Sequence, residues 1–148
     1  MSFNVKQVIS MPFEWTQNLS IGVAEIDNQH KELFKRINNL LDAISQGKGK
    51  QELFAVLEFL EDYSKFHFAK EEKLMLAHNY SAYKAHKAEH ERFIQELNGL
   101  KKKFETAGAS LALVVEVQRK TIDWLIEHIS KIDKQMANMM HGLPKERQ

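Results

Sequence analysis

The stretch HFAKEEKLMLAHNYSAYKAHKAEH, residues 67–90, sets a pattern that the rest of the chain repeats. It places His67 and Glu71 four residues apart, and then His86 and His90 four residues apart. Residues with this spacing lie one above the other on one face of an α-helix. Two neighbouring helices would therefore each present a pair of side chains that can bind a metal ion, although one such pair by itself is weak evidence.

Length and composition indicate one soluble domain. The chain has 148 residues, and the absence of cysteine excludes disulfides, thiolate metal sites, iron–sulfur clusters and cysteine nucleophiles. With 21 basic and 20 acidic residues, the net charge of +1 offers no electrostatic basis for binding nucleic acid. No apolar stretch approaches the ~20 residues of a membrane helix. We expect a cytoplasmic protein with no nucleic-acid partner and no membrane insertion.

Apolar residues recur at the three- and four-residue spacing of amphipathic helices in four stretches. The predicted helices cover about residues 23–45, 51–77, 82–105 and 111–140. Ser81 and Ser110 are candidate N-caps. Short connections between such helices predict an all-α fold, an antiparallel up-down four-helix bundle.

The domain boundaries follow from these helices. Residues 21–141 should form the bundle, and residues 142–148 a frayed tail. Residues 1–20 should form an extended N-terminal arm that packs on the bundle through Phe13 and Trp15, because large aromatic side chains tend to be buried.

Polar residues interrupt the apolar face of every predicted helix. In chain order they are His30, then His67 and Glu71, then His86 and His90, and finally His128 and Asp133. The midpoints between these four groups fall at about residues 49.5, 78.5 and 109, which coincide with the predicted connections. In an antiparallel bundle, residues equidistant from a connection lie at the same level. The seven side chains should therefore converge at one level of the core.

A metal centre is the most economical reason for that convergence. Buried carboxylates and imidazoles cost several kcal/mol when they are unpaired, and no Arg or Lys interrupts the apolar faces. Seven ligands exceed the four of a structural zinc site, and histidines exclude all-oxygen calcium or magnesium coordination. Five imidazoles and two carboxylates suit two iron ions bridged by the carboxylates. We hypothesise that this nitrogen-rich set favours reversible chemistry.

One spacing does not fit a regular helix. His128 and Asp133 are five residues apart, about 140° around an ideal α-helix. A π-bulge near Ser130 or Lys131 would bring both inward, and such bulges occur at functional sites. Alternatively, Asp133 reaches in from the side of the helix.

Other polar and sulfur-containing residues have simpler interpretations. His78 and His141 should be ordinary surface or helix-end residues. Met136, Met139 and Met140 should fill the core at one end of the bundle.

The motifs IDNQH (26–30), HFAKEE (67–72), HKAEH (86–90) and HISKID (128–133) resemble those of the hemerythrin family, and within it the single-domain bacteriohemerythrins. The resemblance extends over about residues 13–140. All seven metal-ligand positions of the family pattern are filled, in the same order and spacing.

The resemblance implies a role for each of these residues. His86, His90 and His128 would bind one iron ion, and His30 and His67 the other, which keeps one position open for dioxygen. Glu71 and Asp133 would bridge the two ions together with an oxo or hydroxo group. The residues that the resemblance places around a dry oxygen pocket are Leu33, Phe68, Trp124, Leu125 and Ile129.

The function implied is reversible dioxygen binding for storage, transport or delivery to an unidentified oxygen-consuming recipient protein, rather than enzymatic turnover. Two alternatives remain open. One is a sensor of dioxygen or nitric oxide, which the lack of an attached signalling domain disfavours. The other is a di-iron redox enzyme such as a peroxidase, an oxidase or a nitric oxide reductase, although no further proton donor interrupts the apolar faces. Iron donation by relatives depends on a cysteine-bearing extension, and this chain has no cysteine.

Overall fold

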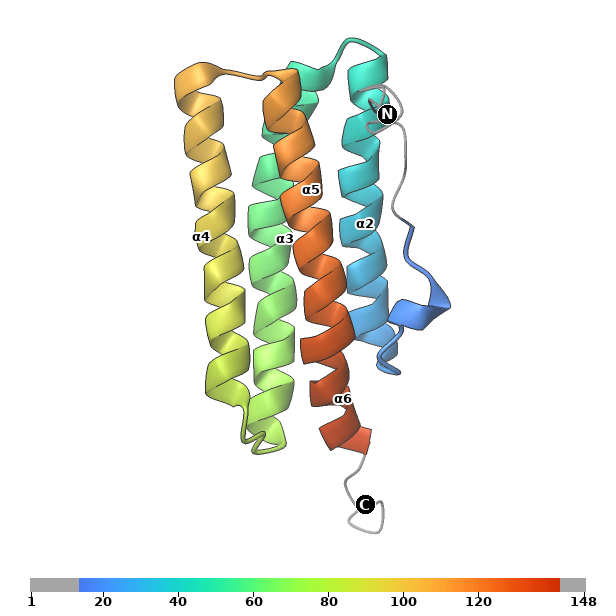
Figure 1. The fold of residues 1–148 in the computed structure, drawn as a ribbon. Coiled ribbons are helices and arrows are strands. Elements are labelled where there is room, and N and C mark those ends of the chain that lie inside the picture. The colour runs from blue at the N-terminus through green and yellow to red at the C-terminus, as the bar shows by residue number, and fades with distance from the viewer. Residues whose placement is uncertain (1–13, 142–148) are drawn as a thin grey trace, which may run out of the picture.

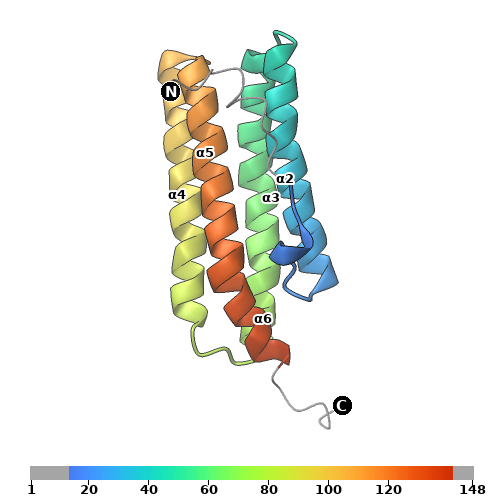
Figure 2. The ribbon, with the colours of Figure 1, turned by 45° about the vertical axis from the view of Figure 1, so that its right-hand side comes forward.

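The computed structural model describes residues 14–141, without the side chains of residues 41, 43–45, 49, 50 and 141. This part of the chain forms helices and turns and contains no β-strand. Its long helical segments run alternately up and down and pack side by side (Figure 1). The view from a second side has the same arrangement (Figure 2). The predicted all-α, antiparallel four-helix bundle is confirmed.

The long helices begin and end within a few residues of the predicted positions, and the fourth is divided into three parts. The elements are α2 (Ala24–Ser45), α3 (Gly49–Ala77), α4 (Tyr83–Ala107), α5 (Leu111–Glu127), the π-helix η2 (His128–Asp133) and α6 (Lys134–His141). The segments α5, η2 and α6 follow one another along a single side of the bundle (Figure 1).

Residues with positive φ lie at each connection between the long helices. Gly47 follows α2 with φ 76°, Asn79 follows α3 with φ 52°, and Gly108 follows α4 with φ 73°. Glycine adopts this conformation without steric cost, and asparagine tolerates it better than most residues do. The chain therefore reverses at the three predicted positions.

Only one of the two candidate N-caps acts as a cap. The Ser110 side chain accepts a hydrogen bond of 3.0 Å from the Leu113 backbone N–H and caps α5, as predicted. The prediction for Ser81 was wrong, because the N-cap of α4 is Ala82 and makes no side-chain hydrogen bond. The Tyr83 N–H instead donates to the Tyr80 carbonyl at 3.2 Å, so a backbone turn precedes the helix where a Ser81 cap was expected.

Residues 14–23 run along the outside of α2 (Figure 1) and include a short 3₁₀ turn, η1 (Gln17–Leu19). Leu19 is buried, and Trp15 is half-buried beneath the ammonium group of Lys31, which lies 4.4 Å from the centre of the ring. The predicted anchor Phe13 and the predicted tail 142–148 lie outside the described residues.

Asp27 joins this segment to the first turn of α2. Its carboxylate accepts hydrogen bonds from the Ser20 hydroxyl at 2.6 Å and from the Ile21 backbone N–H at 2.9 Å. A carboxylate at a helix N-terminus also interacts favourably with the helix dipole. Asp27 thereby positions the beginning of the helix that carries His30 one turn further on.

The core is mostly apolar above and below one polar level, although Gln118 and Thr121 of α5 are also buried. At the end of the bundle that holds the α2–α3 connection it consists mainly of aliphatic residues, among them Leu40, Leu53, Leu57, Leu60, Leu97 and Leu100. At the other end, Met136 is fully buried and Met139 and Met140 pack against the core, as predicted.

Candidate metal centre

Side chains from all four long segments meet at the polar level of the core. Each of them is at most 3% exposed. They are His30 from α2, His67 and Glu71 from α3, His86 and His90 from α4, and His128 and Asp133 from η2. The structure thus brings together every one of the seven residues that the sequence singled out.

Glu71 lies between two sets of imidazole rings. Its Oε1 is 3.0 Å from Nε2 of His86 and 3.0 Å from Nε2 of His90. Its Oε2 is 2.9 Å from Nε2 of His67 and 3.6 Å from Nε2 of His30. The two oxygens of one carboxylate therefore face different histidines.

Asp133 makes the same division from the opposite side. Its Oδ1 lies 3.0 Å from Nε2 of His86 and 3.0 Å from Nε2 of His128. Its Oδ2 lies 3.1 Å from Nε2 of His30. All five histidines thus direct Nε2 toward the two carboxylates.

The carboxylates separate a three-histidine group (His86, His90 and His128) from a two-histidine group (His30 and His67). Together with Glu71 and Asp133, the residues of each group offer ligand atoms that lie within 4.8 Å of one another. Because both carboxylates belong to both sets, the geometry is that of two adjacent cation positions with shared ligands.

Hydrogen bonding inside the cluster is incomplete, which fits a metal centre. Nε2 of His30, Nε2 of His128 and both oxygens of Asp133 are buried and make no hydrogen bond, although they approach one another to 3.0–3.1 Å. A buried polar atom without a partner costs about 1–3 kcal/mol. Cations between these atoms would satisfy them, and imidazole nitrogen with carboxylate oxygen is a ligand set that suits iron.

In the metal-free cluster, the pKa values of His30 and His128 are raised and the pKa of Glu71 is lowered. Burial alone would lower the pKa of His30, but Asp133 and Glu71 raise it to about 9. Burial likewise opposes protonation of His128, yet Asp133 and Glu71 raise its pKa to about 10. Burial would raise the pKa of Glu71, but the surrounding histidines lower it well below its usual value. Protons therefore take the place of metal ions in balancing the buried carboxylates.

The π-helix η2 resolves the spacing of His128 and Asp133. It covers His128–Asp133, and the two residues that bound it are both buried in the core. A π-helical turn holds more residues than an α-helical turn, so residues five apart come onto one face. Of the two possibilities left open by the sequence, the structure has the π-bulge.

Two further side chains hold the histidines from outside, and neither was predicted from the sequence. Nδ1 of His67 donates to Oε1 of Gln29 at 2.7 Å, and Nδ1 of His90 donates to a carboxylate oxygen of Glu72 at 2.9 Å. Each partner directly adjoins a cluster residue in sequence, Gln29 before His30 and Glu72 after Glu71. This adjacency to a predicted ligand, in the motifs IDNQH and HFAKEE, was the signal that the sequence offered for these two contacts.

Apolar and aromatic residues surround the cluster. Phe68 stacks on His90, with ring centres 3.9 Å apart and planes 5° apart, and Trp124 stacks on His128 with ring centres 4.3 Å apart. Both contacts are with the three-histidine group, and Phe68 also lies 5.7 Å from the His67 ring. Of the residues predicted to line an oxygen pocket, those buried with at most 4% exposure are Leu33, Phe68, Leu125 and Ile129, whereas Trp124 is half-buried.

The other histidines do not join the cluster in the described part of the chain. His78 ends α3, where its Nδ1 donates to the Leu74 carbonyl at 2.9 Å, as expected of a helix-end residue. The side chain of His141 lies outside the described residues. Among helices in residues 14–141, none is long and apolar enough to cross a membrane.

Comparison with known proteins agrees with the fold and the cluster, which define a four-helix-bundle metal-binding protein. Residues 21–140 match the family model described as the hemerythrin HHE cation binding domain. The chain therefore belongs to the hemerythrin family.

Named relatives and solved structures agree. The bacteriohemerythrin of Methylococcus capsulatus is 36% identical over 121 residues, which cover 81% of this chain and 90% of that protein. The bacteriohemerythrin of Pseudomonas aeruginosa is 39% identical over 119 residues, or 80% of this chain and 75% of that one. A crystal structure of wild-type hemerythrin superimposes with a TM-score of 0.73 at 30% identity, covering 88% of this chain and 98% of that chain.

Proposed function

We propose that this chain is a di-iron protein that binds dioxygen reversibly and stores or delivers it inside the cell. The observation that carries the proposal is the division of five histidines into unequal groups by two shared carboxylates. Three histidines and two carboxylates supply one more ligand than two histidines and the same two carboxylates. The second position would therefore keep one coordination site open for an exogenous ligand.

In this proposal each residue of the cluster has one role. The three-histidine group would hold one iron ion and the two-histidine group the other, and Glu71 and Asp133 would be shared between the two ions. When bound, two ferrous ions would supply the electrons for reversible dioxygen binding. The protein contributes the geometry, because η2 and α3 fix both bridging carboxylates on rigid elements of the bundle.

Exclusion of water supports reversible binding over turnover. Leu33, Leu125 and Ile129 are at most 1% exposed, and together with Phe68 and Trp124 we propose them as the walls of the oxygen pocket. A dry cavity protects a reactive bound ligand from side reactions with water.

An anaerobic titration tests the proposal. The iron-loaded, reduced protein is titrated with dioxygen, followed by its optical spectrum, and then degassed, with iron counted per chain. We expect two iron ions per chain and a charge-transfer band that appears with dioxygen and disappears on degassing. Irreversible oxidation without release would contradict reversible binding and would favour a sensor or a redox enzyme instead.

A matched variant tests the role of the polar level itself. His67→Leu removes one of the two histidines of the two-histidine group and puts an apolar side chain in its place in the core. We expect it to retain helical content but to lose the dioxygen-dependent band. His78→Leu, a change outside the cluster, should keep the band and serves as the control.

A further inference from the structure

The five histidines of the cluster differ in what their outer nitrogens contact. Nδ1 of His90 donates to the Glu72 carboxylate at 2.9 Å, whereas Nδ1 of His67 donates to the neutral amide of Gln29 at 2.7 Å. The Nδ1 atoms of His30, His86 and His128 are buried and make no hydrogen bond. At the outer nitrogen, Nδ1, only one histidine of the described cluster thus has an anionic partner, and it belongs to the three-histidine group.

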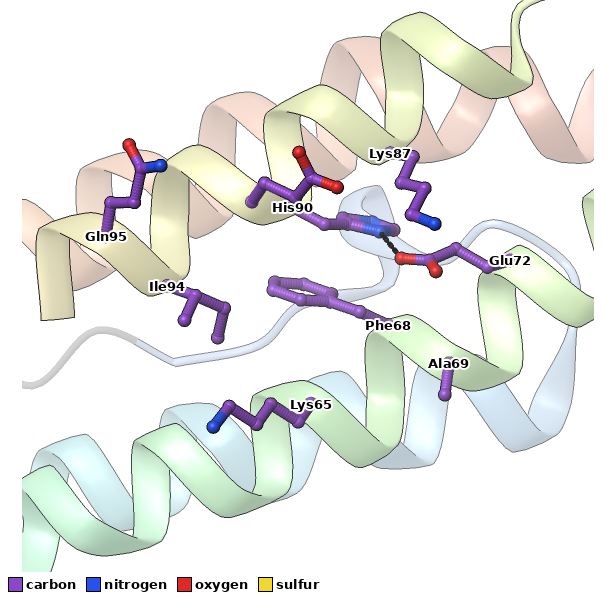
Figure 3. A pocket seen from close by; sticks show the side chains of 9 residues that line it. Lys65, Phe68, Ala69, Glu72, Lys87, His90, Ile94 and Gln95 are labelled. Atoms are coloured by element: carbon purple, nitrogen blue, oxygen red, sulfur yellow. Dashed lines mark hydrogen bonds and ion pairs between the residues drawn. The ribbon is translucent and has the colours of Figure 1, made fainter. Parts of the chain in front are cut away.

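Glu72 also differs from Gln29 in its access to solvent. The Glu72 side chain is 21% exposed, whereas Gln29 is only 5% exposed. Figure 3 shows Glu72 at the edge of a pocket between α3 and α4, with Phe68 and His90 deeper inside. This pocket has a volume of about 420 Å³. The outer partner of His90 can therefore be reached by small molecules, and that of His67 cannot.

We propose that Glu72 is a positioning residue that makes the two halves of the metal centre electronically unequal. A carboxylate only accepts hydrogen bonds, so its contact with Nδ1 requires the proton there and leaves the Nε2 lone pair of His90 free for the metal. Its negative charge would also stabilise the higher oxidation state of an iron ion held by the three-histidine group. Gln29 selects the same tautomer for His67 but adds no charge.

The magnitude of the effect follows from the kind of hydrogen bond. A bond to an ionised acceptor is roughly twice as strong as one between neutral groups. Removing an outer partner of a ligating histidine typically weakens metal binding by about 10- to 100-fold. Phe68 stacks on one face of the His90 ring and restricts the ring further. Loss of Glu72 should therefore alter the tautomer and charge of His90 more than the orientation of its ring.

Three variants separate the effects of charge, hydrogen bonding and the surface. Glu72→Gln keeps an oxygen acceptor and removes the charge, whereas Glu72→Ala removes both. Glu91→Gln removes a charge from an exposed residue that lines the same pocket, and serves as the matched control. Circular dichroism of each variant establishes that the bundle is folded.

Three readouts do not depend on dioxygen: metal affinity, the tautomer of His90 and the midpoint potential of the iron-loaded centre. Cobalt(II) titration measures metal affinity, and ¹⁵N resonances of the zinc-loaded protein report the His90 tautomer. In Glu72→Ala we expect metal binding by the three-histidine group to weaken by about 10- to 100-fold. We also expect His90 to lose its pure Nδ1–H tautomer. In Glu72→Gln we expect the tautomer to persist while the midpoint potential of the iron-loaded centre rises. Glu91→Gln should change neither the metal affinity, nor the His90 tautomer, nor the midpoint potential.

The pocket permits a sharper test by chemical rescue. Formate added to Glu72→Ala should occupy the space of the missing carboxylate and restore cobalt(II) affinity and the tautomer. The same concentration of formate added to the wild type corrects for anion binding elsewhere. The proposal would be overturned if Glu72→Gln and Glu91→Gln shifted the potential equally, or if formate changed Glu72→Ala no more than the wild type.

This inference rests on the proposed function to the extent that it needs a two-metal centre. The two ideas fail separately, because the zinc and cobalt readouts remain valid in a protein that does not release dioxygen. If the wild type takes up fewer than two metal ions, both are overturned. If it takes up two and the Glu72 variants behave like Glu91→Gln, only the inference about Glu72 is overturned.

Discussion

Two levels of the core are equally buried but have opposite chemistry. Near the α2–α3 connection the helices contact one another through aliphatic side chains such as Leu53, Leu57 and Leu97, which are at most 1% exposed. Further along the same helices, ionisable side chains such as Glu71 and Asp133 are fully buried. The two levels share their helices, so the difference between them comes from the side chains and, at the polar level, from the π-helical winding of η2.

The difference separates what folds the chain from what gives it a function. Burying a leucine stabilises the fold by about 1.5–3 kcal/mol whatever is bound elsewhere. The polar level stabilises the fold only when its charges are balanced, by protons or by metal ions. We therefore expect changes at the apolar level to alter stability without altering metal content, and changes at the polar level to alter metal content first.

The largest effect should come from Glu71→Ala. Glu71 is the carboxylate whose two oxygens face both histidine groups, so its loss should reduce metal content from two ions per chain to fewer than one. Metal analysis of the iron-loaded variant measures this, and circular dichroism checks that the helices persist. Glu91→Ala, at an exposed position of α4, should keep both ions. Retention of two ions by Glu71→Ala would contradict the bridging role.

Leu57→Ala is the corresponding test at the apolar level. Leu57 is 1% exposed, and truncation of a buried leucine typically lowers the free energy of unfolding by about 2–5 kcal/mol. Urea unfolding measures the loss, which we expect without any change in metal content. Leu76→Ala, at a position that is 57% exposed, should have little effect on stability. Loss of metal from Leu57→Ala would show that the two levels are coupled.

The free energy of unfolding should depend on pH more strongly in the metal-free protein than in the metal-loaded protein. The pKa of His30 is about 9 and that of His128 about 10 in the folded, metal-free protein, against about 6.5 in the unfolded chain. The folded state therefore retains protons that the unfolded state has lost. The stabilisation that these histidines contribute is complete below about pH 6.5 and disappears as pH rises toward 9–10.

Urea unfolding at a series of pH values measures this dependence. The metal-free protein should lose stability between about pH 6.5 and 10, and the zinc-loaded protein should lose much less, because metal ions replace the protons. Zinc binding should also release protons in this range. Equal pH dependence of the two forms would contradict protonation of the empty cluster.

The smallest effect on stability should come from Ser110→Ala. Ser110 is the N-cap of α5 and lies far from the polar level along that helix. Ser110 accepts the Leu113 N–H, and loss of such a cap typically costs about 1 kcal/mol. Thermal unfolding measures the change, and metal content should stay at two. Ser81→Ala, where the predicted cap is not formed, should have little effect on stability and serves as the control.

The structure shows why some of the site could be predicted and some could not. The level of each polar residue followed from its distance to the nearest connection, because every α-helix rises by the same amount per residue. The local winding at His128–Asp133 could not be decided, since a π-turn and a side approach are both consistent with the five-residue spacing. Gln29 and Glu72 were not assigned because adjacency to a cluster residue does not by itself indicate which neighbouring side chain contacts the outer nitrogen of a histidine.

The sequence by itself determined the four helices, their connections and the seven residues that meet in the core, because helical periodicity and turn chemistry are local properties of the chain. The tertiary structure decided how these residues are divided. Which oxygen of Glu71 faces which histidine depends on the relative rotation of α2, α3 and α4. That rotation is set by side-chain packing between helices, and the unequal division of the histidines into groups of three and two follows from it.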